Sequence, residues 1–228
     1  MTPTVIIPTL NEALALPATL ARVREVWPTA QIIVSDGGSR DATVALALAA
    51  GAKVLSGPAG RGRQLQAGAA AATGRWWLFL HADTLLPRTA ARVVASFVAL
   101  PGAQVATFRL RFDGNHLFLR LCGWFTRFDG VWTRFGDQGI LISRETYAAL
   151  GGFPAWPLFE DVALLRAARQ RGRVVSLPAA VTTSARRFEH HGPLRQQLRN
   201  ALLLRRFLAG ESPDRLATHY GVSHPPST

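Results

Sequence analysis

The chain has 228 residues, of which 48% are hydrophobic and 18% are charged. This length suits one α/β domain with at most a small appendage, and the composition excludes a disordered chain because it supplies ample apolar material for a core. No apolar run reaches the roughly 18 residues of a membrane-spanning helix, and the first residues lack the regions of a secretory signal peptide. We therefore expect a cytoplasmic protein.

The net charge of +12 comes almost entirely from arginine, because Lys53 is the only lysine. Guanidinium groups suit phosphate in a nucleotide, a nucleic acid or a lipid head group, so the charge alone leaves these three partners open. Cys122 is the only cysteine, which excludes an internal disulfide, and its apolar neighbours predict a position in the core.

Short apolar runs alternate with helical patterns through the first half of the chain. We predict strands at residues 4–9, 31–36, 52–57 and 76–83, and helices at residues 13–26, 41–50, 63–72 and 87–99. Such alternation is typical of a parallel sheet with crossover helices, and nearly continuous apolar strands indicate a sheet buried on both faces. The predicted fold class is therefore α/β, with a largely parallel central sheet flanked by helices.

The second half of the chain is less regular. We predict strands at residues 104–112, 137–143 and 173–179, and helices at residues 115–128, 144–150 and 193–209, with further helices opened by Glu160 and Asp161 and by Pro213. No internal repeat, low-complexity tract or linker separates these elements.

Polar residues follow three of the predicted strands at the point where each strand ends. Thr9 and Glu12 follow the first, Asp36 ends the second, and His81 and Asp83 end the fourth. In open parallel sheets, ligands bind outside the carboxyl ends of the strands. The sequence therefore predicts that the three polar groups converge on one site.

Two nucleotide-binding fingerprints are nearly present. The segment "GPAGRGRQ" (57–64) has the glycine spacing of a P-loop, but Arg63 and Gln64 stand where Lys and Ser or Thr are needed. The first strand leads into "TLNEAL", which lacks the glycines of a dinucleotide-binding turn. We exclude a Walker-type NTPase and a Rossmann dehydrogenase on these grounds.

The aspartates at the strand ends allow two interpretations each. Asp83 suits a Mg²⁺ or Mn²⁺ ion that bridges phosphates, or it caps a helix opened by Pro87, with Thr84 competing for that cap. Asp36 could accept hydrogen bonds from a base or ribose, or it could simply belong to the turn built by Gly37 and Gly38. The residues alone leave both questions open.

Glu160 and Asp161 stand in the first turn of a predicted helix. Acidic residues are favoured there by the helix dipole, which is the structural interpretation. The preceding segment, residues 151–159, is rich in Gly, Pro and aromatic residues and resembles the lining of a pocket. A carboxylate at the edge of a pocket is suited to act as a general base.

These motifs together resemble the nucleotide-diphospho-sugar transferases of glycosyltransferase family 2, which have the GT-A fold. The segments that carry the resemblance are "VIIPTLNEA", "IIVSDGGSRDAT", "GRGRQLQAGAAAATGRWWLFLHADT" and "GDQGILISRETYAALGGFP…FEDVALLRAARQRG". They occur in order over about residues 4–172, and the ordered set is more specific than any one of them. The chain is most similar to a compact bacterial branch with "HADT" at the metal motif.

The resemblance implies an inverting transferase that takes a sugar from a nucleotide-diphosphate donor, most simply a UDP-sugar, and adds it to a hydroxyl acceptor. It implies that Pro8, Thr9 and Glu12 lie against the nucleoside and that Asp36 accepts from the base. The acceptor is not identified, although a lipid-linked acceptor is compatible with the chain.

The resemblance also implies roles near the diphosphate. Arg61 and Arg63 are expected near the phosphates, Asp83 on a divalent cation, and Asp161 as the general base. The family's metal motif normally reads Asp-x-Asp, and His81 replaces the first aspartate here. Imidazole can bind Mn²⁺, so His81 is expected either on the metal or on the ribose and phosphates.

The same resemblance divides the chain. Residues 1–192 are expected to form the GT-A domain, with a nucleotide-binding half (1–100) and an acceptor or catalytic half (101–192). Residues 193–228 are expected to form a helical extension.

The predicted helix at residues 193–209 is amphipathic and basic. Leucine and alanine side chains share one face and arginines another: Leu194, Leu198, Ala201 and Leu202, and Arg195, Arg199 and Arg206. One interpretation is a surface helix packed on the domain, and the other is a helix lying on an anionic membrane beside residues 115–128.

Two other functions compete with sugar transfer. A nucleotidyltransferase shares the parallel sheet and the metal-binding aspartates, but it needs a glycine-rich basic loop after the first strand, which "TLNEAL" does not supply. A nucleic-acid-binding module would explain the positive charge, but the aromatic residues sit in apolar runs rather than between arginines on an exposed face.

Overall fold

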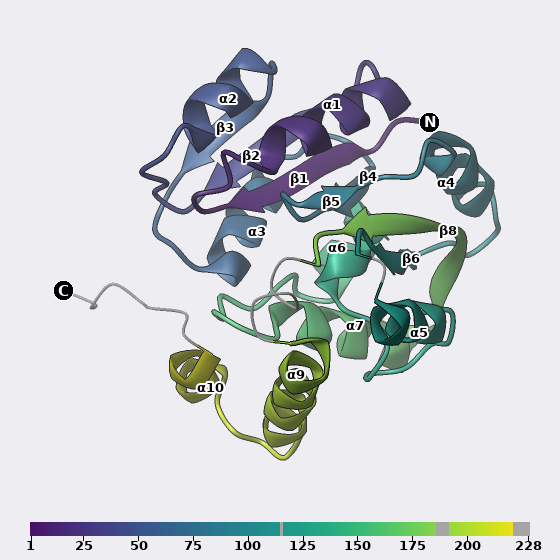
Figure 1. Cartoon of the computed structure of the whole chain (residues 1–228). Coiled ribbons are helices and arrows are strands. Elements are labelled where there is room, and N and C mark those ends of the chain that lie inside the picture. The colour runs from purple at the N-terminus through teal and green to yellow at the C-terminus, as the bar shows by residue number, and fades with distance from the viewer. Residues whose placement is uncertain (115, 186–191, 221–228) are drawn as a thin grey trace.

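An eight-stranded sheet forms the centre of the computed structural model, which describes residues 1–114, 116–185 and 192–220. The strand order is β3-β2-β1-β4-β7-β6-β8-β5. The strands are β1 (Thr4–Thr9), β2 (Ile32–Asp36), β3 (Lys53–Ser56), β4 (Trp76–Phe79), β5 (Thr84–Leu85), β6 (Val105–Phe112), β7 (Ile140–Ser143) and β8 (Val174–Thr183). Figure 1 shows the sheet between two layers of helices.

The predicted parallel arrangement holds for the first half of the chain, where β3, β2, β1 and β4 pair in parallel. The second half is mixed, because β7 runs antiparallel to both β4 and β6, while β8 is parallel to β6 and antiparallel to β5. The α/β class is thus confirmed, with a mixed sheet at its centre.

The helices are α1 (Leu16–Val26), α2 (Thr43–Ala49), α3 (Arg61–Ala70), α4 (Ala90–Val98), α5 (Leu117–Phe125), α6 (Arg144–Ala149), α7 (Glu160–Arg171), α9 (Pro193–Leu208) and α10 (Pro213–Tyr220), with a 3-10 turn η1 (Gly136–Gln138). Within the described residues, no helix is both long enough and apolar enough to cross a membrane.

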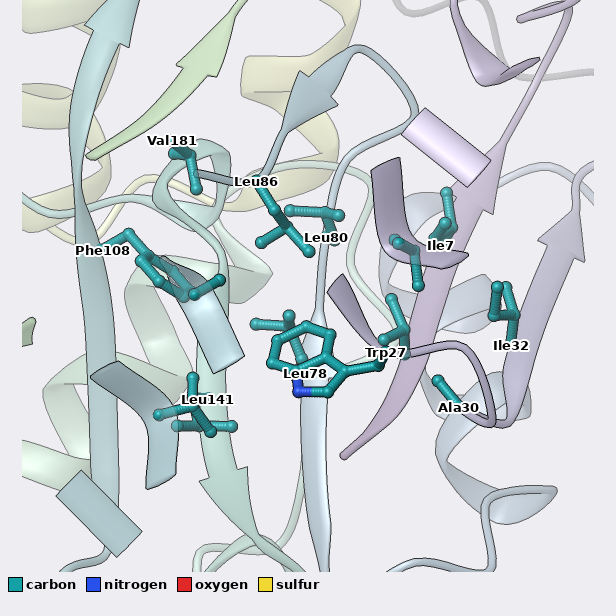
Figure 2. Packing of buried hydrophobic residues seen from close by; sticks show 14 of the residues in the cluster. Ile7, Trp27, Ala30, Ile32, Leu78, Leu80, Leu86, Phe108, Leu141 and Val181 are labelled. Carbon is teal, nitrogen blue, oxygen red and sulfur yellow. The ribbon is translucent and has the colours of Figure 1, made fainter. Parts of the chain in front are cut away.

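The core has one layer on each face of the sheet because alternate strand residues point to opposite faces. Val5 and Ile7 of β1 belong to a cluster with residues of α1, α2 and α4, whereas Ile6 belongs to a cluster with residues of α3, α6 and α7. Figure 2 shows side chains from successive strands, among them Ile7, Leu78 and Phe108, lined up across the first of these faces. The sheet is therefore buried on both faces, as its apolar strands predicted.

A third apolar cluster attaches the C-terminal helices to the domain. Leu203 and Leu204 of α9 and Leu216 of α10 pack against Leu158 and Phe159, which directly precede α7. The C-terminal helices therefore pack on the segment that leads into the predicted catalytic pair.

Several predicted element ends are wrong. β4 ends at Phe79 rather than at residue 83, although the next amide, that of Leu80, still donates to the carbonyl of Ile6 at 2.9 Å. The chain then turns so that Thr84, in β5, pairs with Thr183. Because α4 begins only at Ala90 and has no side-chain cap, neither Asp83 nor Thr84 caps it.

The aromatic helix is also shorter than residues 115–128, and Asn115 lies outside the described residues. α5 packs on β6 through Leu119 and Gly123, and a Cβ on Gly123 would lie 2.7 Å from the carbonyl oxygen of Leu110. This one-sided contact leaves Cys122 partly exposed, so its predicted core position is wrong.

Candidate active site

The ends of β1 and β2 meet as the strand pattern predicted. Register pairs Thr9 with Asp36, and the Thr9 hydroxyl donates to Asp36 Oδ1 at 3.0 Å. Asp36 is 2% exposed and also accepts from the amides of Gly38 (2.9 Å) and Ser39 (2.8 Å) and from the Ser39 hydroxyl (2.5 Å). Asp36 therefore holds the turn after β2, and its contact with a base remains a prediction.

The loops after these two strands are joined to each other. The Asn11 amide donates to Ser39 Oγ at 2.8 Å, and the Arg40 amide donates to Asn11 Oδ1 at 2.8 Å. The amide of Glu12 donates to the hydroxyl of Thr43 at 2.8 Å. Asn11 has φ of 55°, a left-handed conformation that Asn tolerates better than most residues. Glu12 and the nearby Pro8 are both partly exposed at this edge of the sheet.

Gln64 anchors α3 to the same strand ends. Its buried side-chain amide donates to the carbonyls of Thr9 (2.7 Å) and Ser35 (2.8 Å), and its oxygen accepts from the Gly60 amide at 3.3 Å. In the sequence, Gln64 stands out only as a mismatch to a P-loop. Its structural role depends on two carbonyls from distant strands, so the local sequence carries no signal for it.

Asp161 lies with His81 and Gly136 at one point of the fold. The Asp161 carboxylate accepts from the amides of Gly136 (2.5 Å) and Val162 (2.8 Å). A Cβ placed on Gly136 would lie 3.0 Å from Asp161 Oδ2 and 3.2 Å from His81 Nε2, so a larger residue there would press on both side chains. These three residues and Glu160 line a small cavity whose apolar wall consists of Leu65, Phe79, Leu80, Ile140 and Phe153.

Arg61 lies against the acidic pair rather than standing alone. Its guanidinium is ion-paired with Glu160, and Nη2 lies 3.9 Å from Asp161 Oδ1. Glu160 is fully buried, and burial raises the pKa of its carboxyl, while the Arg61 charge opposes that shift. Arg63, two residues further along α3, is exposed. The structure thus places Arg61, but not Arg63, beside the predicted base.

The backbone before the acidic pair is strained. Phe159 has φ of 63° and ψ of 16°, a left-handed conformation that costs about 1–3 kcal/mol for such a residue. Its ring stacks on Phe207 of α9 with centroids 4.9 Å apart and planes 24° apart. α9 therefore holds the turn that aims Glu160 and Asp161, a role that the helical pattern of α9 did not predict.

Asp137 is a further acid that the sequence analysis missed. The residue is partly exposed, but its Oδ1 is buried and has no hydrogen-bond partner. Burial and the negative charges of Asp161 and Asp83 raise the pKa of Asp137 to about 7, and Arg61 opposes the shift. The residue was predicted within a strand, whereas it lies in η1, where the chain turns into β7.

The acidic side chains near the cavity suit a divalent cation. Asp83, Asp137 and Asp161 are close enough for their charges to interact, and a cation would offset that repulsion. No group of three or more His, Cys, Asp and Glu residues in the described parts of the chain is preassembled for a metal. This still fits Mg²⁺ or Mn²⁺ in phosphate sites, where one or two carboxylates share the ion with substrate phosphates and water.

Solved structures of other proteins share the fold. The mannosyltransferase PcManGT from Pyrobaculum calidifontis, in complex with GDP-Man and Mn²⁺, has a TM-score of 0.67 and 19% identity, over 95% of this chain and 67% of that chain. TarS 1–349 from S. aureus, in complex with UDP, has a TM-score of 0.67 and 16% identity, over 90% of this chain and 64% of that chain. The glucosyl-3-phosphoglycerate synthase from Mycobacterium tuberculosis, in complex with Mn²⁺, UDP and phosphoglyceric acid, has a TM-score of 0.57 and 22% identity, over 80% and 69%.

These identities are low, so the likenesses show the fold alone. The chain spans 61% of TarS 1–349 in another crystal structure of that protein, which is less than two thirds of its length. None of the curated proteins matches the chain. The model of glycosyl transferase family 2 matches residues 4–142, which is more than half of the chain, and the fold agrees with it. The chain therefore belongs to glycosyltransferase family 2.

Proposed function

We propose that the protein transfers a sugar from a nucleotide-diphosphate donor, a UDP-sugar in the first instance, to a hydroxyl of an acceptor with inversion at the anomeric carbon. The observation that carries the proposal is the buried Asp161 carboxylate, which lines a cavity with His81 at the carboxyl ends of the strands. Family membership supports it, as do the nucleotide and nucleotide-sugar complexes of the structural neighbours.

The nucleoside is proposed to lie at the ends of β1 and β2, against Pro8, Thr9 and Glu12. Asp36 contributes there chiefly by holding the turn, because Gly38 and Ser39 already donate to its carboxylate. Hydrogen bonds between the loops after the two strands give this part of the site a fixed shape. This limits the conformational entropy that is lost when a donor binds.

The diphosphate is proposed to lie between Asp83 and the start of α3. Asp83 would hold a divalent cation, with Asp137 and His81 nearby, and the cation would offset the charge that develops on the departing nucleoside diphosphate. Arg63, which is exposed at the first turn of α3, is free to turn toward the phosphates. Arg61 would add positive charge to the same region from its position beside Glu160.

Asp161 is proposed to remove the proton from the acceptor hydroxyl. As the hydroxyl oxygen bonds to the anomeric carbon, the bond from that carbon to the diphosphate oxygen breaks, and the proton moves to the Asp161 carboxylate. The amides of Gly136 and Val162 fix the orientation of that carboxylate, so the base does not have to be ordered when the acceptor arrives. The acceptor is proposed to be linked to a lipid.

Hydrolysis of the donor tests inversion without knowledge of the acceptor, because water can take the acceptor's place. Incubation with Mn²⁺ and an α-linked UDP-sugar should release the β-anomer first, as followed by proton NMR before the anomers equilibrate. A first product with the α configuration would contradict a single displacement. The same experiment with GDP-sugars tests which nucleobase of the donor the protein accepts.

A further inference from the structure

Exposed aromatic and leucine side chains gather on α5 and the loop that follows it. Leu117, Leu121, Trp124 and Phe125 are between 44% and 76% exposed, and Phe128 and Trp132 are 50% and 54% exposed. The rings of Trp124 and Phe125, and those of Trp124 and Phe128, have centroids 5.2 Å apart. Every exposed large aromatic side chain in the described part of the chain belongs to this group. Trp124, Phe125 and Phe128 therefore pack together as one exposed aromatic cluster.

Helix α9 adds a leucine stripe next to this surface. α9 turns Gln196, Leu203 and Leu204 inward, while Leu194, Leu198 and Leu202 remain 60%, 63% and 55% exposed. α5 and α9 pack against each other, and Figure 1 shows both on the side of the molecule opposite to α1 and α2. We call the exposed apolar residues of α5, its loop and α9 the α5–α9 face.

Arginine prevails among the charges around this face, and the one acid of the loop, Asp129, is paired with Arg134 and Arg169. The two helices contain five arginines, namely Arg120, Arg195, Arg199, Arg205 and Arg206, and no Asp or Glu. In the loop, the Arg127 guanidinium lies over the Trp124 ring, 4.6 Å from its centroid. Arg206 is paired with Glu211. The arginines of the two helices therefore place positive charge on the same elements as the exposed apolar residues.

This combination favours an anionic lipid surface over a second copy of the chain. In a two-fold symmetric dimer the same patch faces itself, so arginines would meet arginines and repel. An anionic bilayer offers apolar depth for Trp, Phe and Leu and negative head groups for Arg, which is the pattern of interfacial helices.

We propose that the α5–α9 face docks the protein on an anionic membrane surface. The inner side of α9 packs on Leu158 and Phe159, immediately before Glu160 and Asp161, so docking brings the bilayer close to the predicted base. If the proposed function holds, on which this step rests, a lipid-linked acceptor can present its hydroxyl to Asp161 without leaving the membrane.

Vesicle cosedimentation of the full chain tests the proposal. Wild-type protein should pellet with vesicles of phosphatidylcholine and phosphatidylglycerol in equal parts, less so at high salt, and only weakly with phosphatidylcholine alone. Leu121→Gln combined with Leu198→Gln should weaken binding at least about tenfold, because both leucines lose apolar burial in the bilayer. Leu48→Gln combined with Leu100→Gln is the matched control, since those leucines are 57% and 55% exposed on other elements.

The charge part of the proposal has its own pair of variants. Arg120→Gln combined with Arg195→Gln should weaken binding by roughly fivefold for each arginine, whereas Arg88→Gln combined with Arg92→Gln should not. Absence of pelleting, or equal loss in test and control pairs, would overturn the proposal. A dimer in light scattering that the Leu121 and Leu198 changes dissociate would assign the face to a second copy instead.

Failure of docking and failure of the proposed function give different results. Asp161→Asn should pellet like the wild type, because Asp161 is 6% exposed and lies away from the surface. Protein that pellets but releases no sugar from any nucleotide donor would contradict the transferase alone. Protein that hydrolyses donors but ignores vesicles would contradict the docking surface alone.

Discussion

Asp161→Asn should slow sugar transfer or donor hydrolysis by at least about a hundredfold, the contribution typical of a general base. The substitution keeps the shape of the side chain. The Gly136 and Val162 amides donate to different carboxylate oxygens, so the amide oxygen of Asn can accept from only one of them. Because the shape of the side chain is kept, donor affinity should stay within about twofold of the wild type. The loss of activity should therefore be a decrease in kcat. Kinetics with a UDP-sugar and calorimetric titration with UDP separate the two effects.

The matched control is Asp214→Asn in the first turn of α10, where the carboxylate is exposed and outside the site. This variant should leave both the rate of sugar transfer or hydrolysis and the donor affinity unchanged. Normal turnover by Asp161→Asn would show that another group, with Asp137 as the first candidate, accepts the proton.

Gly62→Ala should produce the largest loss of stability among single methyl additions near the site. A Cβ there would overlap the carbonyl oxygen of Pro154 and lie 2.7 Å from the oxygen and 2.8 Å from the nitrogen of Trp156. The Gly62 amide also donates to the Trp156 carbonyl at 3.1 Å, so α3 and the loop cannot separate without losing this bond. We expect a loss of about 1–3 kcal/mol in the free energy of unfolding, the usual cost of overpacking.

For a chain of this size, that loss lowers the unfolding midpoint by roughly 3–10 °C. Gly57→Ala is the control, because nothing lies within 4 Å of its Cβ position and its φ is not in the left-handed region. Its effect should stay within about 0.5 kcal/mol. Equal midpoints for the two variants in a calorimetric scan would mean that the loop moves aside at little cost.

The first half of the fold could be predicted from the sequence because local sequence patterns determine its strands and helices. Each strand there is a short apolar run between helical patterns, and crossover connections make such strands parallel. The convergence of Thr9, Asp36 and His81 on one edge follows from the same rule. Parallel pairing of β1 with β2 and β4 places the carboxyl ends of these strands at the same edge of the sheet.

The second half could not be predicted to the same depth because its pairings join distant segments. β7 lies between β4 and β6, which fixes its direction by tertiary packing and not by any turn in the sequence. The end of β4 depends likewise on its neighbours, so an apolar run that continues to Leu80 suggested too long a strand. Burial of Leu80 in the core explains why the residue is apolar outside the strand.

The site residues that were missed share one property, which is that their partners are remote. The side chain of Gln64 donates to carbonyls of β1 and β2, and Phe207 stacks on Phe159. The charges of Asp83 and Asp161 help to raise the pKa of Asp137. None of these relations leaves a motif in the local sequence. The leucine stripe of α9 was visible in the helical pattern, but only the structure shows that other residues make the packing face.

We propose that a nucleotide diphosphate binds at the strand ends with a divalent cation on Asp83. Thermal unfolding of the wild type and of Asp83→Ala, with UDP, GDP, ADP or dTDP and with or without Mn²⁺, tests it most directly. A ligand at a hundredfold its dissociation constant adds about 2.7 kcal/mol, which raises the midpoint of a chain of this size by roughly 5–10 °C. We predict such a shift for one nucleotide in the wild type, dependent on Mn²⁺ and absent in Asp83→Ala. A shift that persists without Mn²⁺ and in Asp83→Ala, or no shift with any nucleotide, would contradict the claim.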